Sequence, residues 1–225
     1  FTDFSPFERY GNVSLRYVDS VGDLHQPDMI ILPGTKSTIA DLRWLRQCGL
    51  EAAIHKAADA GTLVFGVCGG YQMLGRTVSD PEQVEAAGTT EILGMGLLEM
   101  DTIFLGEKVQ AQTTGVFAGI SGVLSDLNGM SYSGYEIHMG RSEEEMPALA
   151  GTGNVYGSYV HGVFDASGIS DTILKALCVR KGIDFDALET FDISEYKEHQ
   201  YDLLADAVRS GLDMEFIYRV LNREL

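Results

Sequence analysis

The 225-residue sequence is poor in cysteine and contains no long apolar run. Its three cysteines, at positions 48, 68 and 178, are an odd number without CxxC or Cys/His metal spacing, which argues against a disulfide framework and a structural zinc site. No stretch of 18 apolar residues occurs, and the opening "FTDFSPFERY" lacks the charged and apolar parts of an export signal. We therefore expect a cytoplasmic protein with free thiols and no membrane segment.

Basic residues are also scarce, with 16 Lys and Arg against 33 Asp and Glu and a net charge of −17. This balance repels phosphate backbones and anionic membrane surfaces, so nucleic-acid binding is not expected. The acidic excess is typical of a well-solvated surface and indicates no particular partner. Because repeats, low-complexity segments and long linkers are absent, residues 1–225 are interpreted as one domain.

The first half of the chain alternates between strand-like and helix-like segments. "NVSLRYV" (12–18) alternates with period two, and "DMIILPG" (28–34) and "TLVFGVC" (62–68) are apolar runs. Helical spacing lies between the two runs, in two segments that each end at a glycine, and Thr38 followed by Asp41 resembles a capping box. The pattern predicts a strand–helix–strand unit in a parallel sheet covered on both faces.

The rest of the chain divides into a strand-rich and a helix-rich part. Residues 93–159 are rich in Gly, Thr, Val and Tyr and predict strands joined by tight turns. Helical periodicity returns in 170–182, 194–211 and 212–225. The fold class expected is α/β, with a mostly parallel central sheet and helices on both faces.

The stretch "GVCGGYQMLG" (66–75) places Cys68 at a sharp turn from a strand into a helix. Gly66 and Gly70 complete the Gly-x-nucleophile-x-Gly pattern, which leaves no room for β-carbons on either side. The start of a helix favours a thiolate, and the N–H of Gly69 would face a developing oxyanion. The two glycines favour a nucleophile over a buried core thiol at this position, whereas Cys48 and Cys178 read as structural.

A cysteine nucleophile needs a base, and the chain has five histidines. Three of them, His25, His55 and His199, lie in polar or helical surroundings and read as surface residues. His161 in "SYVHGVF" ends a strand-like run and can face the same sheet edge as Cys68. Spacing favours it over His138 in "GYEIHMG", which stays open as the alternative.

The segment "GTKST" (34–38) resembles a phosphate-binding loop but lacks the glycine that must precede the lysine, since Thr35 stands there. No ATP site of that type is expected. The turn through Gly34 and Thr35 follows a predicted parallel strand beside the Cys68 strand, so it can supply a second backbone N–H to an oxyanion hole.

Four motifs, "ILPGTKSTIADLRWLR", "GVCGGYQMLG", "GYEIHMG" and "SYVHGVFD", in this order resemble the glutamine amidotransferase domain of the cobyric acid synthase family, a class I glutaminase of the cobalamin pathway. The resemblance runs from "FTDF" to about Asp165. It implies a flavodoxin-like α/β sandwich in which a cysteine and a histidine hydrolyse glutamine to release ammonia. Carried over, Cys68 is the nucleophile, His161 is the base, and Gln72 helps to bind the substrate.

The resemblance also implies partners. The substrate is L-glutamine, and the ammonia passes to an N-terminal synthetase domain that uses ATP and magnesium and amidates a corrinoid acceptor, cobyrinic acid a,c-diamide, to cobyric acid. This chain itself is expected to hold no cofactor or metal. Because the resembling domains open with an apolar strand before "FTDF", the chain is interpreted as a fragment without its first strand and synthetase domain, which leaves one sheet edge unpaired.

One position departs from the usual pattern of class I glutaminases. Most of them carry a glutamate two residues after the histidine, where this chain has Val163. The carboxylate that orients His161 is therefore missing or comes from elsewhere, with Asp165 and Glu136 as unranked candidates. Weak glutaminase activity is predicted on this ground. Two other interpretations stay open: a glutaminase subunit for lipid II amidation, and a docking module without catalysis.

Overall fold

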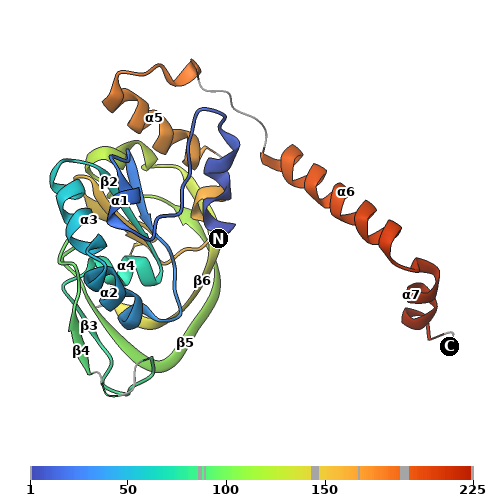
Figure 1. Cartoon of the computed structure of the whole chain (residues 1–225), viewed down its shortest axis with the longest axis horizontal. Helices are drawn as coiled ribbons and strands as arrows, with labels where there is room; N and C mark the ends of the chain where they lie inside the picture. The colour runs from blue at the N-terminus through green and yellow to red at the C-terminus, as the bar shows by residue number, and fades with distance from the viewer. Residues whose placement is uncertain are drawn as a thin grey trace.

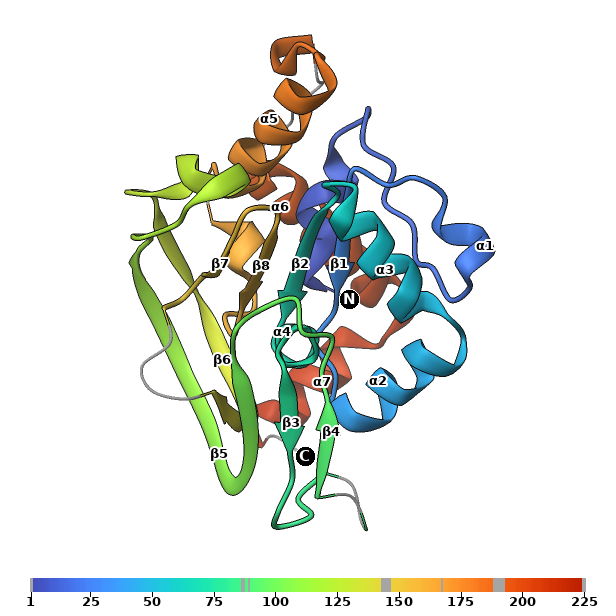
Figure 2. The same cartoon turned by 90° about the vertical axis from the view of Figure 1, so that its left-hand side faces the viewer.

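A four-stranded, mostly parallel sheet forms the centre of the molecule (Figure 2). The computed structural model describes residues 2–85, 88, 90–142, 147–166, 168–187 and 193–223. Strands β1 (Met29–Leu32), β2 (Leu63–Val67) and β8 (Val155–Ser158) run parallel, and β7 (Ala150–Thr152) pairs antiparallel with β8. The order is β1-β2-β8-β7, so the predicted parallel strand–helix–strand unit is confirmed. All five residues of β2 are buried, as expected for the middle of a covered sheet.

Helices cover both faces of this sheet, which confirms the predicted fold class. One apolar cluster joins the sheet to α2 (Thr38–Gln47), α3 (Leu50–Asp59) and α4 (Gly69–Leu74). The other joins it to α5 (Ile169–Lys181) and three 3-10 helices, namely η1 (Thr2–Arg9), η2 (Gly122–Leu127) and η3 (Val163–Asp165). The short α1 (Val21–Leu24) precedes β1, and η4 (Phe185–Ala187) follows α5.

A second sheet lies beside the first and contains strands predicted in the middle of the chain. Its order is β4-β3-β5-β6, from β3 (Thr77–Ser79), β4 (Glu91–Leu93), β5 (Asp101–Val116) and β6 (Ser131–Ser142). The long strands β5 and β6 pair antiparallel and form a curved ribbon along one side of the molecule (Figure 2). Their length brings residues of β6 to the carboxyl end of β2, where the site lies.

Two local expectations were wrong. Residues 12–18 alternate in burial but form no strand in the structure, because Val13 and Leu15 pack against the core without a neighbouring strand to pair with. Helix α2 does begin at Thr38, but Asp41 does not cap it. The Asp41 carboxylate instead accepts a hydrogen bond from the hydroxyl of Thr35.

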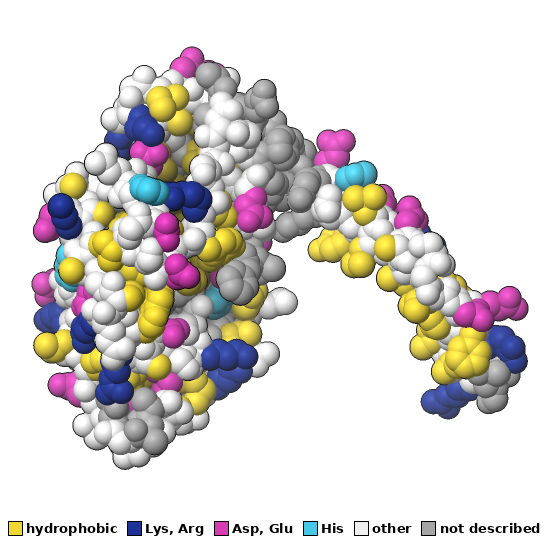
Figure 3. Space-filling view, viewed as in Figure 1, with side chains coloured by type: hydrophobic (Ala, Val, Ile, Leu, Met, Phe, Trp, Pro, Cys, Tyr) yellow, Lys and Arg dark blue, Asp and Glu magenta, His cyan; other side chains and the backbone are white. Residues whose placement is uncertain are grey.

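The last two helices, α6 (Ile193–Gly211) and α7 (Met214–Leu221), extend away from the body (Figure 1). Large hydrophobic side chains are exposed on them, and Figure 3 shows hydrophobic groups gathered along one side of this arm. The most exposed are Tyr201, Leu204 and Leu221, at 62%, 61% and 70%. Among the described residues, no helix is both long and apolar enough to cross a bilayer.

Candidate active site

Cys68 lies at the turn between β2 and α4, in a strained backbone conformation. Its φ of 50° and ψ of −109° are unusual for a residue other than glycine. The turn is tight on both sides: a β-carbon on Gly66 would lie 2.6 Å from the backbone of Tyr71, and one on Gly70 would lie 2.1 Å from the carbonyl oxygen of Leu32. The local geometry is therefore that of a nucleophile elbow. The Cys68 side chain is mostly enclosed, and its Sγ lies 3.5 Å from the carbonyl oxygen of Ile137 on β6.

His161 follows β8, and its backbone is held by the long ribbon. Its backbone N–H donates to the carbonyl oxygen of Tyr135 on β6 at 2.8 Å, and its carbonyl oxygen accepts from the N–H of Tyr135 at 3.1 Å. The ring of Tyr135 also stacks on the imidazole, with centroids 5.2 Å apart. The imidazole is hydrogen-bonded to the side chain of Cys68. Gly34 lies against both residues, because a β-carbon there would be 2.8 Å from Cε1 of His161 and 3.5 Å from Cβ of Cys68.

The other side of the imidazole bonds to Asp3, in the N-terminal 3-10 helix. Nδ1 of His161 lies 2.9 Å from Oδ2 of Asp3, and Oδ1 accepts from the N–H of Gly162 at 2.8 Å. The hydrogen bond to Asp3, with the one to Cys68, outweighs desolvation and raises the pKa of His161 from 6.5 to about 10. For Asp3, burial pushes the pKa upward, but the bonds from His161 and Gly162 outweigh it and lower that pKa. At neutral pH the imidazole is protonated on both nitrogens.

The carboxylate at Nδ1 of His161 is that of Asp3, and neither of the two candidates expected from the sequence holds this place. Glu136 bonds to His138 at 3.3 Å instead, and Asp165 lies in η3 without taking the place at Nδ1. Val163, at the position where a glutamate is usual, is buried in the core. The prediction of weak activity assumed that no carboxylate orients His161, and that premise was wrong.

The alternative base, His138, is engaged elsewhere. Its Nδ1 lies 2.6 Å from the carbonyl oxygen of Gly140, and its ring stacks on Tyr159 with centroids 4.1 Å apart. With Glu136 at Nε2, both ring nitrogens have partners other than Cys68. The structure thus brings His161, and not His138, to the thiol.

The turn after β1 lies beside the elbow, as its place after a parallel strand predicts. A β-carbon on Gly69 would lie 3.1 Å from the backbone nitrogen of Thr35, so the two segments are in close contact. The Thr35 hydroxyl donates to Asp41 and accepts from the N–H of Ser37 at 3.0 Å, which fixes the turn. The backbone near Gly34, Thr35 and Gly69 therefore surrounds the space next to Cys68.

Gln72 lies in the turn of α4 that follows Cys68, and its side chain is buried, with 2% exposed. Its Oε1 accepts a hydrogen bond from the Thr38 hydroxyl at 3.1 Å. Its Nε2 has no partner among the described residues. A buried donor without a partner is costly unless a ligand or water satisfies it.

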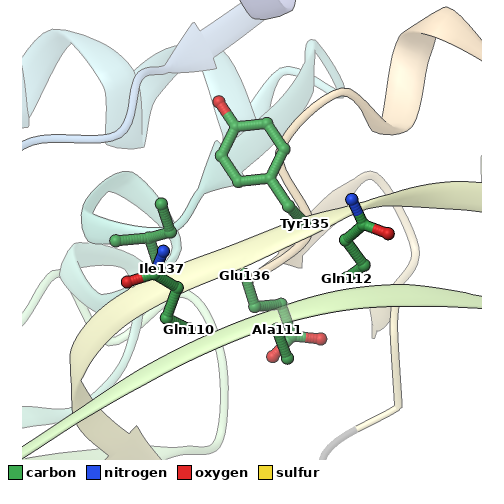
Figure 4. Close-up of a pocket in the computed structure, with 6 residues that line it drawn as sticks. All are labelled: Gln110, Ala111, Gln112, Tyr135, Glu136 and Ile137. Atoms are coloured by element: carbon green, nitrogen blue, oxygen red, sulfur yellow. The ribbon is translucent and has the colours of Figure 1, made fainter.

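A shallow hollow of about 380 Å³ lies on the β5–β6 ribbon (Figure 4). It borders the site because Tyr135 stacks on His161 and the Ile137 carbonyl lies against Cys68. Figure 4 shows Tyr135 and Ile137 on one side of β6 and Glu136 on the other. The lining residues are Gln110, Ala111, Gln112, Tyr135, Glu136 and Ile137.

Sequence reasoning singled out Cys68, His161, Gly34, Thr35, Gly69 and Gln72, and the structure places all six around one edge of the central sheet. It missed Asp3 and Thr38. Asp3 stands in "FTDF", between residues that gave no chemical signal, and Thr38 was read only as a helix start.

Comparison with known proteins gives relatives in sequence and in fold. Residues 1–169 match the CobB/CobQ-like glutamine amidotransferase domain family. The chain is 49% identical to a cobyric acid synthase of Lachnoclostridium phytofermentans and 45% identical to one of Ruminiclostridium cellulolyticum, over 98% of this chain in each case. It covers 48% and 46% of those proteins, so it spans about half the length of these relatives.

Two solved structures resemble the fold. A crystal structure described as glutamine amidotransferase aligns with a TM-score of 0.51 at 17% identity, over 80% of this chain and 92% of that one. The PurLQS structure from Thermotoga maritima aligns with a TM-score of 0.53 at 20% identity, over 78% and 92%. At these identities the likeness shows the fold alone.

Proposed function

The chain belongs to the CobB/CobQ-like glutamine amidotransferase family, and we propose that it hydrolyses L-glutamine to glutamate and ammonia through a thioester on Cys68. The observation that carries this proposal is the line from Cys68 through His161 to Asp3: a thiol on an elbow, an imidazole in contact with it, and a carboxylate on the far nitrogen. This is the nucleophile, base and orienting group that acyl transfer requires.

The first half of the reaction forms the thioester. The raised pKa of His161 keeps the imidazole protonated at neutral pH, and its positive charge lies next to the sulfur of Cys68, which reacts as the thiolate. The thiolate attacks the carboxamide carbon, and backbone N–H groups near Thr35 and Gly69 hold the oxyanion. As the tetrahedral intermediate collapses, Nε2 of His161 gives its proton to the leaving nitrogen, and ammonia departs.

The second half releases glutamate. His161, now neutral, takes a proton from a water molecule, whose oxygen attacks the thioester carbonyl. The second tetrahedral intermediate expels the Cys68 thiolate, which again faces a protonated His161, and the new carboxyl group loses its proton to solvent. Gln72, in the helix turn that follows Cys68, helps to bind the glutamine.

The relatives support a proposal for what happens to the ammonia after it is released. Proteins about twice as long that match nearly the whole chain are named cobyric acid synthase. The ammonia would then pass to an N-terminal synthetase domain, which uses ATP and magnesium to amidate carboxylates of cobyrinic acid a,c-diamide and form cobyric acid. Free cysteines at the three positions are consistent with work in the cytoplasm.

Covalent labelling tests the proposed nucleophile. The protein is treated with 6-diazo-5-oxo-L-norleucine, a glutamine analogue that alkylates cysteine nucleophiles, and the adduct is located by mass spectrometry. We expect one adduct on Cys68, none in Cys68→Ser, and an unchanged adduct in Cys178→Ser as the matched control. Wild-type protein that neither forms this adduct nor hydrolyses glutamine contradicts the proposal.

A further inference from the structure

Strand β6 contacts both members of the Cys68–His161 pair. The carbonyl oxygen of Ile137 lies 3.5 Å from Sγ of Cys68, and the backbone of Tyr135 exchanges two hydrogen bonds with that of His161. The side chain of Tyr135 lies on the same side of β6 as that of Ile137 (Figure 4). Its ring stacks on the imidazole, with centroids 5.2 Å apart and planes 16° apart. Tyr135 therefore holds His161 through its backbone and through its ring.

The residue before Tyr135 allows β6 to come this close to His161. A β-carbon on Gly134 would overlap the carbonyl oxygen of His161 and would lie 2.6 Å from Cγ1 of Val160. Strand β6 also pairs with β5, where Gln112 stands opposite Tyr135. The backbone of Tyr135 is thus held between β5 and His161, so its ring extends from a fixed point.

Stacking adds a constraint that the hydrogen bonds of the imidazole do not supply. The bond between Nδ1 of His161 and Asp3, at 2.9 Å, sets the direction of one ring nitrogen. The torsion that tilts a histidine ring has a broad minimum, so the plane of the ring needs a separate support. A stacked aromatic ring opposes the tilt, and an aromatic face within about 6 Å also attracts a cation. The cation is present, because the hydrogen bonds to Asp3 and Cys68 raise the pKa of His161 to about 10.

Tyr135 is neutral and covers the imidazole from outside. Burial raises the pKa of Tyr135 above its ordinary value of 10, so the phenol keeps its proton at pH 7. The charges of Asp3, Asp165 and Cys68 raise this pKa further. Tyr135 is 43% exposed, whereas the side chain of His161 is 16% exposed, so the ring lies between the imidazole and solvent. The contact runs through the face of the ring and the backbone, and the hydroxyl takes no part in it.

We propose that Tyr135 is a positioning residue for the reaction: its ring holds the plane of the His161 imidazole and its backbone holds the His161 main chain, so that Nε2 stays directed at Cys68. This inference rests on the proposed function, because it assigns proton transfer to His161. Tyr135 acts through the imidazole in this role and not on the binding of glutamine. Its loss should therefore lower kcat and leave KM nearly unchanged.

Glutamine hydrolysis and the pKa of His161 test the inference in a matched pair of variants. Tyr135→Leu keeps an apolar side chain over the imidazole and removes the aromatic face, whereas Tyr135→Phe keeps that face. We expect kcat of Tyr135→Leu to fall about 10-fold with KM changed less than about threefold, and Tyr135→Phe to stay within about threefold of wild type. The pKa is measured by NMR on protein labelled with carbon-13 at histidine Cε1, with His161→Gln to assign the signal. It should fall by about 0.5 to 1 in Tyr135→Leu and stay unchanged in Tyr135→Phe.

Two further variants on β6 separate positioning from the stability of the strand. Tyr132→Leu removes a ring that stacks on Phe117, with centroids 4.8 Å apart, and should leave kcat and the pKa of His161 unchanged. Gly134→Ala puts a β-carbon against the carbonyl oxygen of His161 and should lower kcat although the ring of Tyr135 is present. Thermal unfolding midpoints are measured for every variant, and labelling of Cys68 by 6-diazo-5-oxo-L-norleucine counts the intact sites.

The outcomes separate this inference from the function on which it rests. If wild-type protein hydrolyses glutamine and Tyr135→Leu keeps its kcat, the positioning role is wrong and the glutaminase function stands. A fall in kcat without a change in the pKa of His161 also overturns the positioning role, because loss of strand stability would produce it. A rise in KM at constant kcat overturns it as well, since it would place Tyr135 at the substrate. Wild-type protein without hydrolysis or analogue labelling overturns the function itself.

Discussion

One carboxylate far from the motifs in sequence completes the catalytic geometry that we propose. Asp3 is 158 residues from His161 in the chain, yet its Oδ2 lies 2.9 Å from Nδ1 of the imidazole. The helix η1 is held against the core by the buried side chains of Phe4 and Phe7, and this packing places Asp3 next to His161. The elbow, by contrast, is local, since Gly66, Cys68 and Gly70 stand within five residues, and the sequence alone could predict it.

We expect Asp3→Asn to lower glutaminase activity strongly. The amide cannot stabilise the protonated imidazole, and it leaves the wrong tautomer populated, so kcat should fall roughly 10²- to 10⁴-fold. Steady-state hydrolysis of glutamine measures this. Asp165→Asn and Glu136→Gln are the controls, because neither carboxylate bonds to Nδ1 of His161. A larger loss in either control than in Asp3→Asn would contradict the assignment of Asp3.

The pKa of His161 makes folding stability depend on pH. Its value of about 10 in the folded protein lies above the ordinary 6.5, so the folded state binds the proton more tightly. The resulting stabilisation is complete below pH 6.5 and is lost as pH rises toward 10, with a slope of at most about 1.4 kcal/mol per pH unit.

Urea unfolding at several pH values measures this dependence. The comparison is with His161→Gln, which removes the titrating group and keeps a polar side chain. The difference in unfolding free energy between the two proteins should shrink steadily from pH 6.5 to 10. A constant difference over this range would show that Asp3 and Cys68 do not raise the pKa of His161.

At the scale of elements, the sequence predicted the helices and strands that follow from local residue patterns. It did not predict which extended segments find a partner strand. The apolar runs at 28–34 and 62–68 became β1 and β2, and the helical spacing between them became α2 and α3. "NVSLRYV" has the same period-two alternation as a strand, but strand formation needs a partner edge, which spacing cannot reveal. In the structure Val13 and Leu15 are partly buried against the core, but their backbone forms no strand pairing.

The second sheet shows the same limit. Strands were predicted in 93–159, yet nothing in their spacing separates a second sheet from an extension of the first. The functional consequence lies in β6, which holds His161 through the backbone of Tyr135 and confines Gln72 through Gly140. The βαβ unit can therefore be predicted from the sequence. The position of β6 beside the candidate site cannot, because it depends on how the second sheet packs on the first.

At the scale of the whole molecule, the chain divides into a packed body and an exposed arm. Periodicity predicted both helices of the arm, and the structure confirms them as α6 and α7. Periodicity could not say where they lie, because an apolar face predicts burial and here Leu204, Val208 and Phe216 remain exposed. The family match ends at residue 169, before this arm, whereas the cobyric acid synthase relatives match 98% of the chain.

Truncation after Ala187 should therefore leave the body stable. No residue of α7 is buried, and the described part of α6 is largely exposed, so removing them takes away little buried apolar surface. We expect the unfolding free energy to change by less than about 0.5 kcal/mol, as for surface changes away from the core. Glutamine hydrolysis should be retained, because every residue assigned to the site precedes the cut.

The same truncation should reduce self-association, since an exposed apolar face promotes contacts between molecules. Urea unfolding and sedimentation velocity of the full and shortened chains measure the two effects. Truncation after Phe164 serves as the opposite control, because it also removes Ile169, Ile173 and Leu174 of α5 from the core cluster and should unfold the body. A large loss of stability on cutting at Ala187 would show that the arm packs on the body in solution, with its apolar side as the contact.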